Sequence, residues 1–325
     1  MGGNGAEGKF LRVSIKPVAG NRRLSCSVSR FSRQRRGPYR LREIQSSPMK
    51  LIVLSDIHLA PAGAQLYGLD PAARFARVVD IINRDHRDVA FVVIAGDLVH
   101  SGDRAAYEVF RTILNQVHAP AILLMGNHDR RASFRAVFPN ADDDGNGYVQ
   151  SVRTLDAATL ITIDTLDESA TTHAGKLCDK RLAFLEDGLR RAPQDRPVLL
   201  FQHHPPLDLG LPHMDAFKLQ DSEAEWRVFQ RTRMPDFMFF GHIHRPAAGI
   251  WRGVPFHIQR ATSHQVAFDL TTSTYIPGTH EWPDYSLVTV TGSDIVILQR
   301  SFLYDGPTFS LDGSDAQAAS SEPQR

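Results

Sequence analysis

The sequence predicts an α/β fold in which helices flank two β-sheets. The first observation is that short apolar runs alternate with amphipathic stretches from Met49 to Phe240. The second is that the segments after Gly241 become short and hairpin-like, as in antiparallel sheets. The third is that a chain of 325 residues, 42% of them hydrophobic, can bury the core of one large domain.

The first half of the chain has the order of a βαβαβ unit. The predicted strands and helices are strand 50–54, helix 71–84, strand 91–95, helix 104–117 and strand 121–124. Asp70 suits the N-cap of the first helix and Pro71 suits its first turn. Apolar side chains at helical spacing then form one buried face of that helix.

The second half contains further strands and helices. Strands are predicted near 148–153, 159–163, 198–202 and 237–240, and helices at 180–191 and 222–232. After these come runs at 247–252, 255–260, 264–268, 286–290 and 294–299. We expect these last runs to form a second, mostly antiparallel sheet.

The charge distribution separates a basic beginning from an acidic remainder. Residues 1–48 hold 11 Lys and Arg against 2 Asp and Glu, whereas the rest holds 26 against 34. We predict that 1–48 is a disordered extension or an over-long start, and the alternatives are a targeting segment or a nucleic-acid or membrane arm. The catalytic domain is predicted at 49–312, followed by a disordered tail at 313–325.

The two cysteines and the apolar runs bear on the compartment. Cys26 and Cys178 show no C-x-x-C spacing, so neither a disulfide framework nor a thiolate zinc site is indicated. The apolar runs are far shorter than the roughly 18 residues of a membrane span. We therefore expect a soluble, cytoplasmic protein.

Residue types that bind metal ions follow five of the predicted strands. Functional sites of α/β sheets form at the carboxyl ends of strands, where the loops converge. One such fragment is weak evidence, because a Gly-Asp or a lone His is common in turns. Five fragments in order indicate one shared site. They are Ser55-Asp56-Ile57-His58, Gly96-Asp97, Gly126-Asn127-His128-Asp129, His203-His204-Pro205-Pro206 and Gly241-His242-Ile243-His244.

The ordered motifs D-x-H, G-D, G-N-H-D, H-x-P and G-H-x-H resemble the signature of the calcineurin-like metallophosphoesterase superfamily. The resemblance implies a two-sheet αββα sandwich of the metallophosphoesterase type, which hydrolyses phosphoesters with two divalent metal ions. A looser similarity to bacterial class III cyclic nucleotide phosphodiesterases and to glycerophosphodiesterases is carried by residues 65–68, 96–99, 203–207 and 263–266.

The resemblance also implies which residues hold the metals. One ion would be bound by Asp56, His58, Asp97 and His244, and the other by Asp97, Asn127, His203 and His242. Asp97 would bridge the two ions, since its two carboxylate oxygens can each face one of them. A nitrogen and oxygen ligand set without thiolate favours Mn²⁺, Fe²⁺, Zn²⁺ or Co²⁺.

The charge of such a centre favours a phosphodiester substrate. Two divalent cations, two carboxylates and a bridging hydroxide leave about +1, which one phosphodiester anion balances. Because metal binding lowers the pKa of water toward neutrality, we expect the bridging hydroxide to attack phosphorus in line. No protein nucleophile is then needed.

Three neighbouring residues are given supporting roles. His128 is the predicted catalytic residue, which contacts the transition state or protonates the leaving group, because its usual pKa lies near neutrality. Asp129 either orients His128 or caps a helix after the strand. His204 is expected beside the metal ligand His203, although these two could exchange roles. Weaker pocket candidates, outside the predicted site, are Tyr67, His213, Met214 and His264.

The sequence therefore predicts a metal-dependent phosphodiesterase that acts on a small phosphodiester. The first hypothesis for its substrate is a cyclic nucleotide such as 3′,5′-cyclic AMP. Glycerophosphodiester hydrolysis is the alternative. A nuclease is disfavoured by the acidic remainder after residue 48, and a non-catalytic scaffold is disfavoured by the complete ligand set. We expect neither a nucleic acid nor a membrane as partner, and a homodimer through the last hairpins and residues 270–285 is a further hypothesis.

Overall fold

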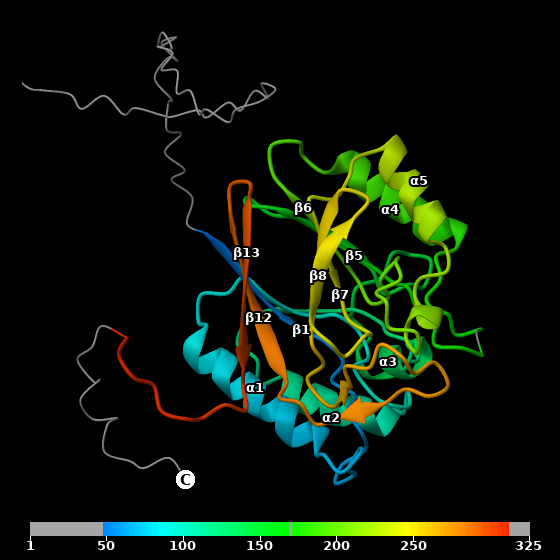
Figure 1. The fold of residues 1–325 in the computed structure, drawn as a ribbon. Helices are drawn as coiled ribbons and strands as arrows, with labels where there is room; N and C mark the ends of the chain where they lie inside the picture. The colour runs from blue at the N-terminus through cyan, green and yellow to red at the C-terminus, as the bar shows by residue number, and fades with distance from the viewer. Residues whose placement is uncertain (1–47, 170, 312–325) are drawn as a thin grey trace, which may run out of the picture. The chain divides into compact units, whose positions relative to one another are not determined.

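The computed structural model describes residues 48–169 and 171–311 (Figure 1). The extension predicted at 1–48, apart from its last residue, lies outside the described residues, and so does the tail predicted at 313–325. The domain boundaries given by the sequence therefore stay predictions.

The first sheet has five strands, of which three form the predicted βαβαβ unit. Its spatial order is β13 (Asp294–Ser301), β12 (Asp284–Thr291), β1 (Met49–Leu54), β2 (Phe91–Ile94) and β3 (Ala121–Leu123). Strands β1, β2 and β3 are parallel, whereas β12 runs antiparallel to β1 and β13. The register places Val53 opposite Val93 on one side and Ser286 on the other.

The second sheet has six strands and is mainly parallel. Its spatial order is β4 (Ser151–Thr154), β5 (Thr159–Ile163), β6 (Val198–Gln202), β7 (Phe237–Phe240), β9 (Val254–Ile258) and β8 (Ala247–Trp251). The four central strands are parallel, and β4 and β8 run antiparallel at the two edges. A separate two-stranded ribbon pairs β10 (Gln265–Val266) with β11 (Gly278–Thr279).

The prediction that the runs after Gly241 form one antiparallel sheet is wrong. Strands β8 and β9 extend the second sheet beside β7, whereas β12 and β13 return to the first sheet beside β1. The run predicted at 264–268 contains only the two residues of β10. The physical reason is that a hairpin pattern specifies pairing between sequence neighbours, whereas β1 and β7 each left an open edge that a distant strand could cover.

The helices lie close to their predicted positions. They are α1 (Pro71–Asp85), α2 (Arg104–Leu114), α3 (Arg131–Val137), α4 (Asp179–Arg191) and α5 (Ser222–Arg231), with a 3₁₀ turn, η1, at Asp215–Phe217. The Asp70 side chain accepts a hydrogen bond from Ala73 N at 3.0 Å, which confirms the N-cap of α1. Helix α3 was not predicted, because only two of its seven residues are buried and no helical period could be read.

Three apolar layers hold the sandwich together. Ile52 and Leu54 face the layer under α1, α2 and α3, whereas Leu51 and Val53 face the layer between the two sheets. In that middle layer the rings of Phe201 and Phe239 stack with centroids 4.6 Å apart. Helices α4 and α5 cover the other face of the second sheet. The αββα sandwich is confirmed.

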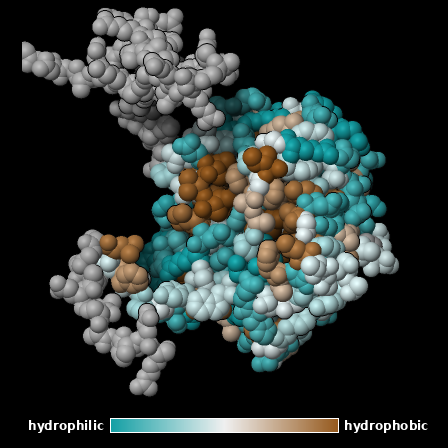
Figure 2. Space-filling model, in the orientation of Figure 1, coloured by the Kyte–Doolittle hydropathy of each residue, from teal (hydrophilic) through white to brown (hydrophobic). Residues whose placement is uncertain are grey.

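One edge strand of each sheet carries exposed apolar side chains. On β8 this is Ile250, and on β13 they are Val296 and Leu298. Figure 2 shows apolar surface over the same strands. A homodimer contact through the last hairpin would use this surface, and it stays a prediction. Within the described residues, no helix is long and apolar enough to cross a membrane.

Candidate metal centre

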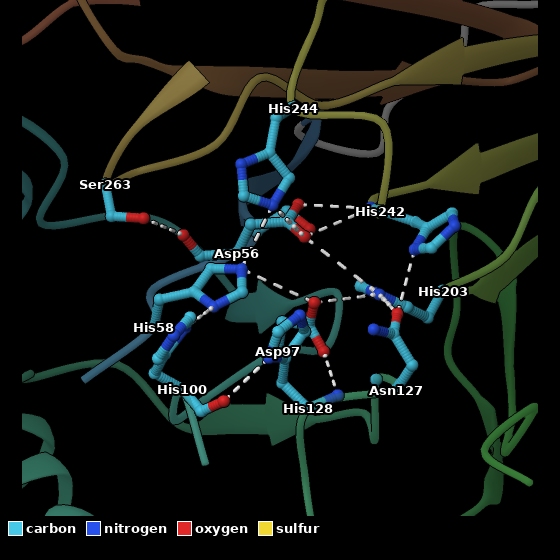
Figure 3. Close-up of polar contacts among 12 residues, drawn as sticks. Asp56, His58, Asp97, His100, Asn127, His128, His203, His242, His244 and Ser263 are labelled. Atoms are coloured by element: carbon cyan, nitrogen blue, oxygen red, sulfur yellow. Dashed lines mark hydrogen bonds and ion pairs between the residues drawn. The ribbon is translucent and has the colours of Figure 1, made fainter. Parts of the chain in front are cut away.

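All seven predicted metal ligands converge where the carboxyl ends of strands from both sheets meet (Figure 3). Their loops follow β1, β2 and β3 in the first sheet and β6 and β7 in the second. Asp97 lies in the middle of the group. Its Oδ2 atom is 3.4 Å from His58 Nε2 and 3.4 Å from His203 Nε2.

The side chains form two groups on either side of Asp97. On one side His58 Nε2 is 3.0 Å from His244 Nε2, which is 3.3 Å from Asp56 Oδ1. The donor atoms of this group, with Asp97, all lie within 4.8 Å of one another.

On the other side Asn127 Oδ1 is 2.8 Å from His242 Nδ1 and 3.2 Å from His203 Nε2. The two groups thus contain the residues of the two predicted ligand sets, with Asp97 between them, and their roles as metal ligands stay a prediction.

The two oxygens of Asp97 have different surroundings. Oδ2 faces both histidines, while Oδ1 accepts a hydrogen bond from His128 N at 2.8 Å. Oδ2 is thus the oxygen that faces a histidine of each group, and the sharing of Asp97 between two ions stays a prediction.

The backbone bends sharply at five of the seven positions. Non-glycine residues with positive φ are uncommon, and each costs roughly 1–2 kcal/mol. Here φ lies between 50° and 70° at Asp56, His58, Asp97, His242 and His244. Backbone hydrogen bonds between loops stabilise the bends, since Asp56 N donates to Gly96 O at 3.1 Å and His58 N donates to Asp97 O at 2.9 Å. Such strain is typical of functional sites.

Glycine is required where these loops touch. A Cβ atom on Gly126 would collide with the backbone nitrogen and the carboxylate of Asp97. A Cβ atom on Gly241 would collide with Ser55 Oγ and would approach Asp56 Oδ2 to 3.0 Å. The glycine before Asn127 and the glycine before His242 thus allow the loops to come close enough to build the site.

The hydrogen bonds behind the histidines turn their lone pairs toward the centre. His203 Nδ1 is 2.7 Å from Ala95 O, and His244 Nδ1 is 2.8 Å from His264 O. A carbonyl only accepts, so each Nδ1 carries a proton, and each Nε2 presents a lone pair inward when the ring is neutral. His242 Nε2 is buried and has no hydrogen-bond partner among the described residues. The Asp and His side chains are positioned for metal binding.

The electrostatics of the site also demand positive charge. Asp56 and Asp97 are almost completely buried. Burial disfavours the charge of Asp97, but His203 and His128 hold its pKa well below the usual value. Burial would likewise lower the pKa of His203, yet the charges of Asp97 and Asp56 raise it to about 9. Divalent cations would replace such protons, because metal binding to these groups releases them.

His203 and His204 have different surroundings, although they are adjacent. His204 Nδ1 is 2.7 Å from Thr165 Oγ1, and His204 Nε2 is 3.1 Å from His173 O. Both nitrogens of His204 are therefore engaged away from Asp97, while His203 Nε2 faces it. His203, His204 and His242 nevertheless offer donor atoms within 4.8 Å of one another, so the assignment of His203 as the ligand stays a prediction.

Asp129 is placed differently from either role predicted for it. Its carboxylate accepts hydrogen bonds from four donors, namely Leu98 N, Val99 N, Gly126 N and Tyr107 Oη, at 2.8–3.3 Å. The N-cap of α3 is Arg130 instead. The ring of His128 is oriented by another group, because its Nδ1 lies 2.6 Å from His100 O. Asp129 therefore fixes the loops on either side of the site.

The part of the chain that carries the five motifs matches a family of known proteins. The sequence model of the family described as calcineurin-like phosphoesterase matches residues 49–246. The chain belongs to this family. Membership confirms the predicted class of hydrolase and accounts for the order of the five motifs.

Relatives of this phosphoesterase carry names that refer to two kinds of diester. A probable cyclic nucleotide phosphodiesterase from Rhodopseudomonas palustris is 54% identical over 268 residues, which cover 82% of this chain and 98% of that protein. A glycerophosphodiester phosphodiesterase from Enterobacter lignolyticus is 32% identical over 226 residues, which cover 68% of this chain and 80% of that protein.

Solved structures share the fold of this phosphoesterase. A purple acid phosphatase from yellow lupin has a TM-score of 0.61 at 14% identity, covering 82% of this chain and 53% of that chain. A dimetal phosphatase from Danio rerio has a TM-score of 0.56 at 14% identity, covering 79% of this chain and 100% of that chain. At this identity the likeness establishes the fold alone.

A cavity of about 460 Å³ opens onto the phosphoesterase centre, within the usual size range of small-molecule sites. Tyr67, Met214 and His264, named earlier as weaker candidates, line it. His213 is not among its lining residues. Other lining residues, which the sequence did not single out, include His100, His173 and Phe217. Only His100 had a signal, because it follows β2 in the same loop as Asp97.

A buried carboxyl group lies behind the H-x-P loop of the phosphoesterase. Glu225 on α5 is fully buried, and neither carboxyl oxygen has a hydrogen-bond partner of normal geometry among the described residues. Burial raises its pKa to about 8, although the neighbouring Gln202 side chain opposes this rise. Gln202 Nε2 in turn donates to His204 O at 2.9 Å. Glu225 is therefore protonated at neutral pH.

Replacing Glu225 by Gln should remove a pH-dependent loss of stability. The folded pKa of about 8 lies above the ordinary value of 4.5, so the wild type becomes less stable as pH rises between these values. Urea unfolding should be measured at about pH 5, 7 and 9. The free energy of unfolding of the variant should rise relative to that of the wild type as the pH rises, by on the order of a few kcal/mol at the highest pH.

The control for this comparison is Glu108→Gln, which changes an exposed glutamate on α2 that pairs with Arg104. Such a surface pair contributes little to stability, so the pH dependence should match that of the wild type. If Glu225→Gln also matches the wild type at every pH, Glu225 is ionised in the folded protein and the assignment fails.

Proposed function

We propose that the chain is a binuclear-metal phosphodiesterase that hydrolyses a cyclic nucleotide such as 3′,5′-cyclic AMP. The observation that carries the proposal is the placement of Asp97 Oδ2 at 3.4 Å from a histidine of each ligand group. One carboxylate oxygen between two sets of inward-facing donors suits a pair of cations. When bound, two divalent cations supply Lewis-acid charge and a water of lowered pKa.

The ligand sets follow the two groups of side chains. Asp56, His58, Asp97 and His244 would hold one cation, and Asp97, Asn127, His203 and His242 would hold the other. The metal is Mn²⁺, Fe²⁺, Zn²⁺ or Co²⁺ on the chemistry of these donors. The amide of Asn127 is oriented by its own contact, since its Nδ2 donates to His173 Nδ1 at 2.8 Å.

His128 is the proposed catalytic residue. Its ring lines the cavity, and its Nδ1 is fixed by His100 O at 2.6 Å. Because a carbonyl only accepts, Nδ1 keeps its proton, and in the doubly protonated ring Nε2 carries the second proton, which it can give to a leaving oxygen. Asp129 and His204 hold the loops behind the centre.

The choice of a cyclic nucleotide is supported by the relative from Rhodopseudomonas palustris, which is matched over 98% of its length. Apolar and aromatic side chains in the cavity, such as Tyr67, Phe217 and Ile276, also suit a nucleobase. A glycerophosphodiester is the second candidate, because of the relative at 32% identity. The cytoplasmic location, the absence of a nucleic-acid or membrane partner and the homodimer stay predictions.

The substrate proposal is tested with the full chain and Mn²⁺. Initial rates should be compared for 3′,5′-cyclic AMP, 2′,3′-cyclic AMP, a glycerophosphodiester and an aryl phosphodiester, and the first should give the highest kcat/KM. A higher kcat/KM for the glycerophosphodiester would favour the second candidate. If none of the diesters is hydrolysed, the proposal that the chain is a phosphodiesterase is refuted.

Replacing Asp97 by Asn should impair both metal positions at once. The neutral amide keeps the size of the side chain but removes the charge that faces both groups. We expect less than the wild-type content of metal and a fall in kcat of at least about 10²-fold, as for the loss of a charge-stabilising group. Asp294→Asn, at an exposed position of β13, is the control and should retain both. Wild-type metal content in Asp97→Asn would exclude the bridge.

Replacing His128 by Asn should separate chemistry from metal binding. We expect metal content to stay at the wild-type value while kcat on 3′,5′-cyclic AMP falls roughly 10²–10⁴-fold, as for a lost general acid. The fall should be smaller for an aryl diester, whose leaving group needs no proton. A variant that loses metal would show that His128 is a ligand instead.

A further inference from the structure

The histidines at the centre differ in what lies behind them. His203 and His244 each place Nδ1 against a main-chain carbonyl, at 2.7 Å and 2.8 Å. His58 has no such carbonyl behind it among the contacts of the described residues. Its Nδ1 lies 3.2 Å from Nδ1 of His100, a side chain that the sequence analysis did not include in the site.

A hydrogen bond between two imidazole nitrogens restricts which nitrogen of each ring can carry the proton. His58 Nε2 is directed into the cluster, 3.4 Å from Asp97 Oδ2, so in a ligand this atom presents its lone pair. The proton of neutral His58 must then be on Nδ1, which donates it to the atom behind. His100 Nδ1 can accept only if His100 carries its own proton on Nε2.

The backbone fixes the position of His100. Beyond the ends of β1 and β2 the chains continue to pair, because Leu59 N donates to Leu98 O at 3.1 Å and His100 N donates to Leu59 O at 2.9 Å. Leu59 and Val99 form a parallel bridge at this point. The two histidines therefore face one another across a rigid pair of loops.

His100 also contacts the proposed catalytic residue. Its carbonyl oxygen lies 2.6 Å from His128 Nδ1, and the two rings stack with centroids 5.0 Å apart at 20°. A single residue thus contacts a metal-facing histidine through its ring and the catalytic histidine through its main chain.

We propose that His100 is a positioning residue. Its Nδ1 accepts a hydrogen bond from the Nδ1–H group of His58 and so holds His58 in the orientation and tautomer that bind metal. The inference rests on the proposed function, because it requires that the cluster binds cations. Partners of this kind behind a metal-bound histidine typically contribute 10–100-fold to metal affinity or activity.

The test compares His100→Leu with His100→Asn in the full chain. Leu keeps bulk but offers no acceptor, whereas Asn Oδ1 can occupy the place of Nδ1. Equilibrium dialysis against Mn²⁺ should show one of the two ions bound about 10–100-fold more weakly by His100→Leu and within a few-fold of wild type by His100→Asn. Co²⁺ absorption should show the same change in one of two sites. His118→Leu, at an exposed position after α2, is the control.

The outcomes separate the two proposals. Wild-type affinity in His100→Leu overturns the role of His100 while leaving the binuclear centre intact. Equal weakening in Leu and Asn also overturns it, because packing and not the acceptor would then be responsible. A wild type that binds no metal overturns the proposed function and this inference with it. Melting temperatures without metal identify a variant that fails to fold, and His100→Ala then takes the place of Leu with the same expected loss.

Discussion

The rest of the site depends on the burial of two carboxylates, Asp56 and Asp97, at the junction of two sheets. Anions removed from water are costly unless donors and opposite charges surround them. The surrounding structure supplies both, through the backbone amides of His128 and His242, which donate to Asp97 and Asp56, and through His203 and His244, whose pKa values rise despite their burial because of these carboxylates. The bent backbone and the close glycine contacts are the means by which five loops bring these groups together.

The residues near the centre and those farther out differ in their surroundings. Residues around Asp97 are held by main-chain hydrogen bonds and by the hydrogen bonds that Asp129 accepts from four donors. The cavity wall farther out is formed by Tyr67, η1 and the ribbon of β10 and β11. On the proposed function, the residues around Asp97 would set the type of reaction and this outer wall would set the choice of substrate.

Much of this could be predicted from the sequence, because the strongest signals are local. Strands such as β1 and β6 are short apolar runs that end in distinctive motifs, so both their positions and their side chains at the centre were found. The placement of β9 and β12 could not be predicted, since it depends on which distant edge each strand covers. His100 was missed for a similar reason, because its contact with His58 arises only when two loops align. The role of Asp129 depends likewise on donors from three separate segments.

The separation of the ligands along the chain has a consequence for assembly. Asp56 and His242 lie 186 residues apart and come from different sheets, yet the His242 amide donates to the Asp56 carboxylate. Neither half of the chain holds the full set of predicted ligands, so binding by all seven residues would require the two sheets to be docked. A cation held only by the docked form adds its binding free energy to that form. Each ion would therefore stabilise the contact between the two halves of the sandwich.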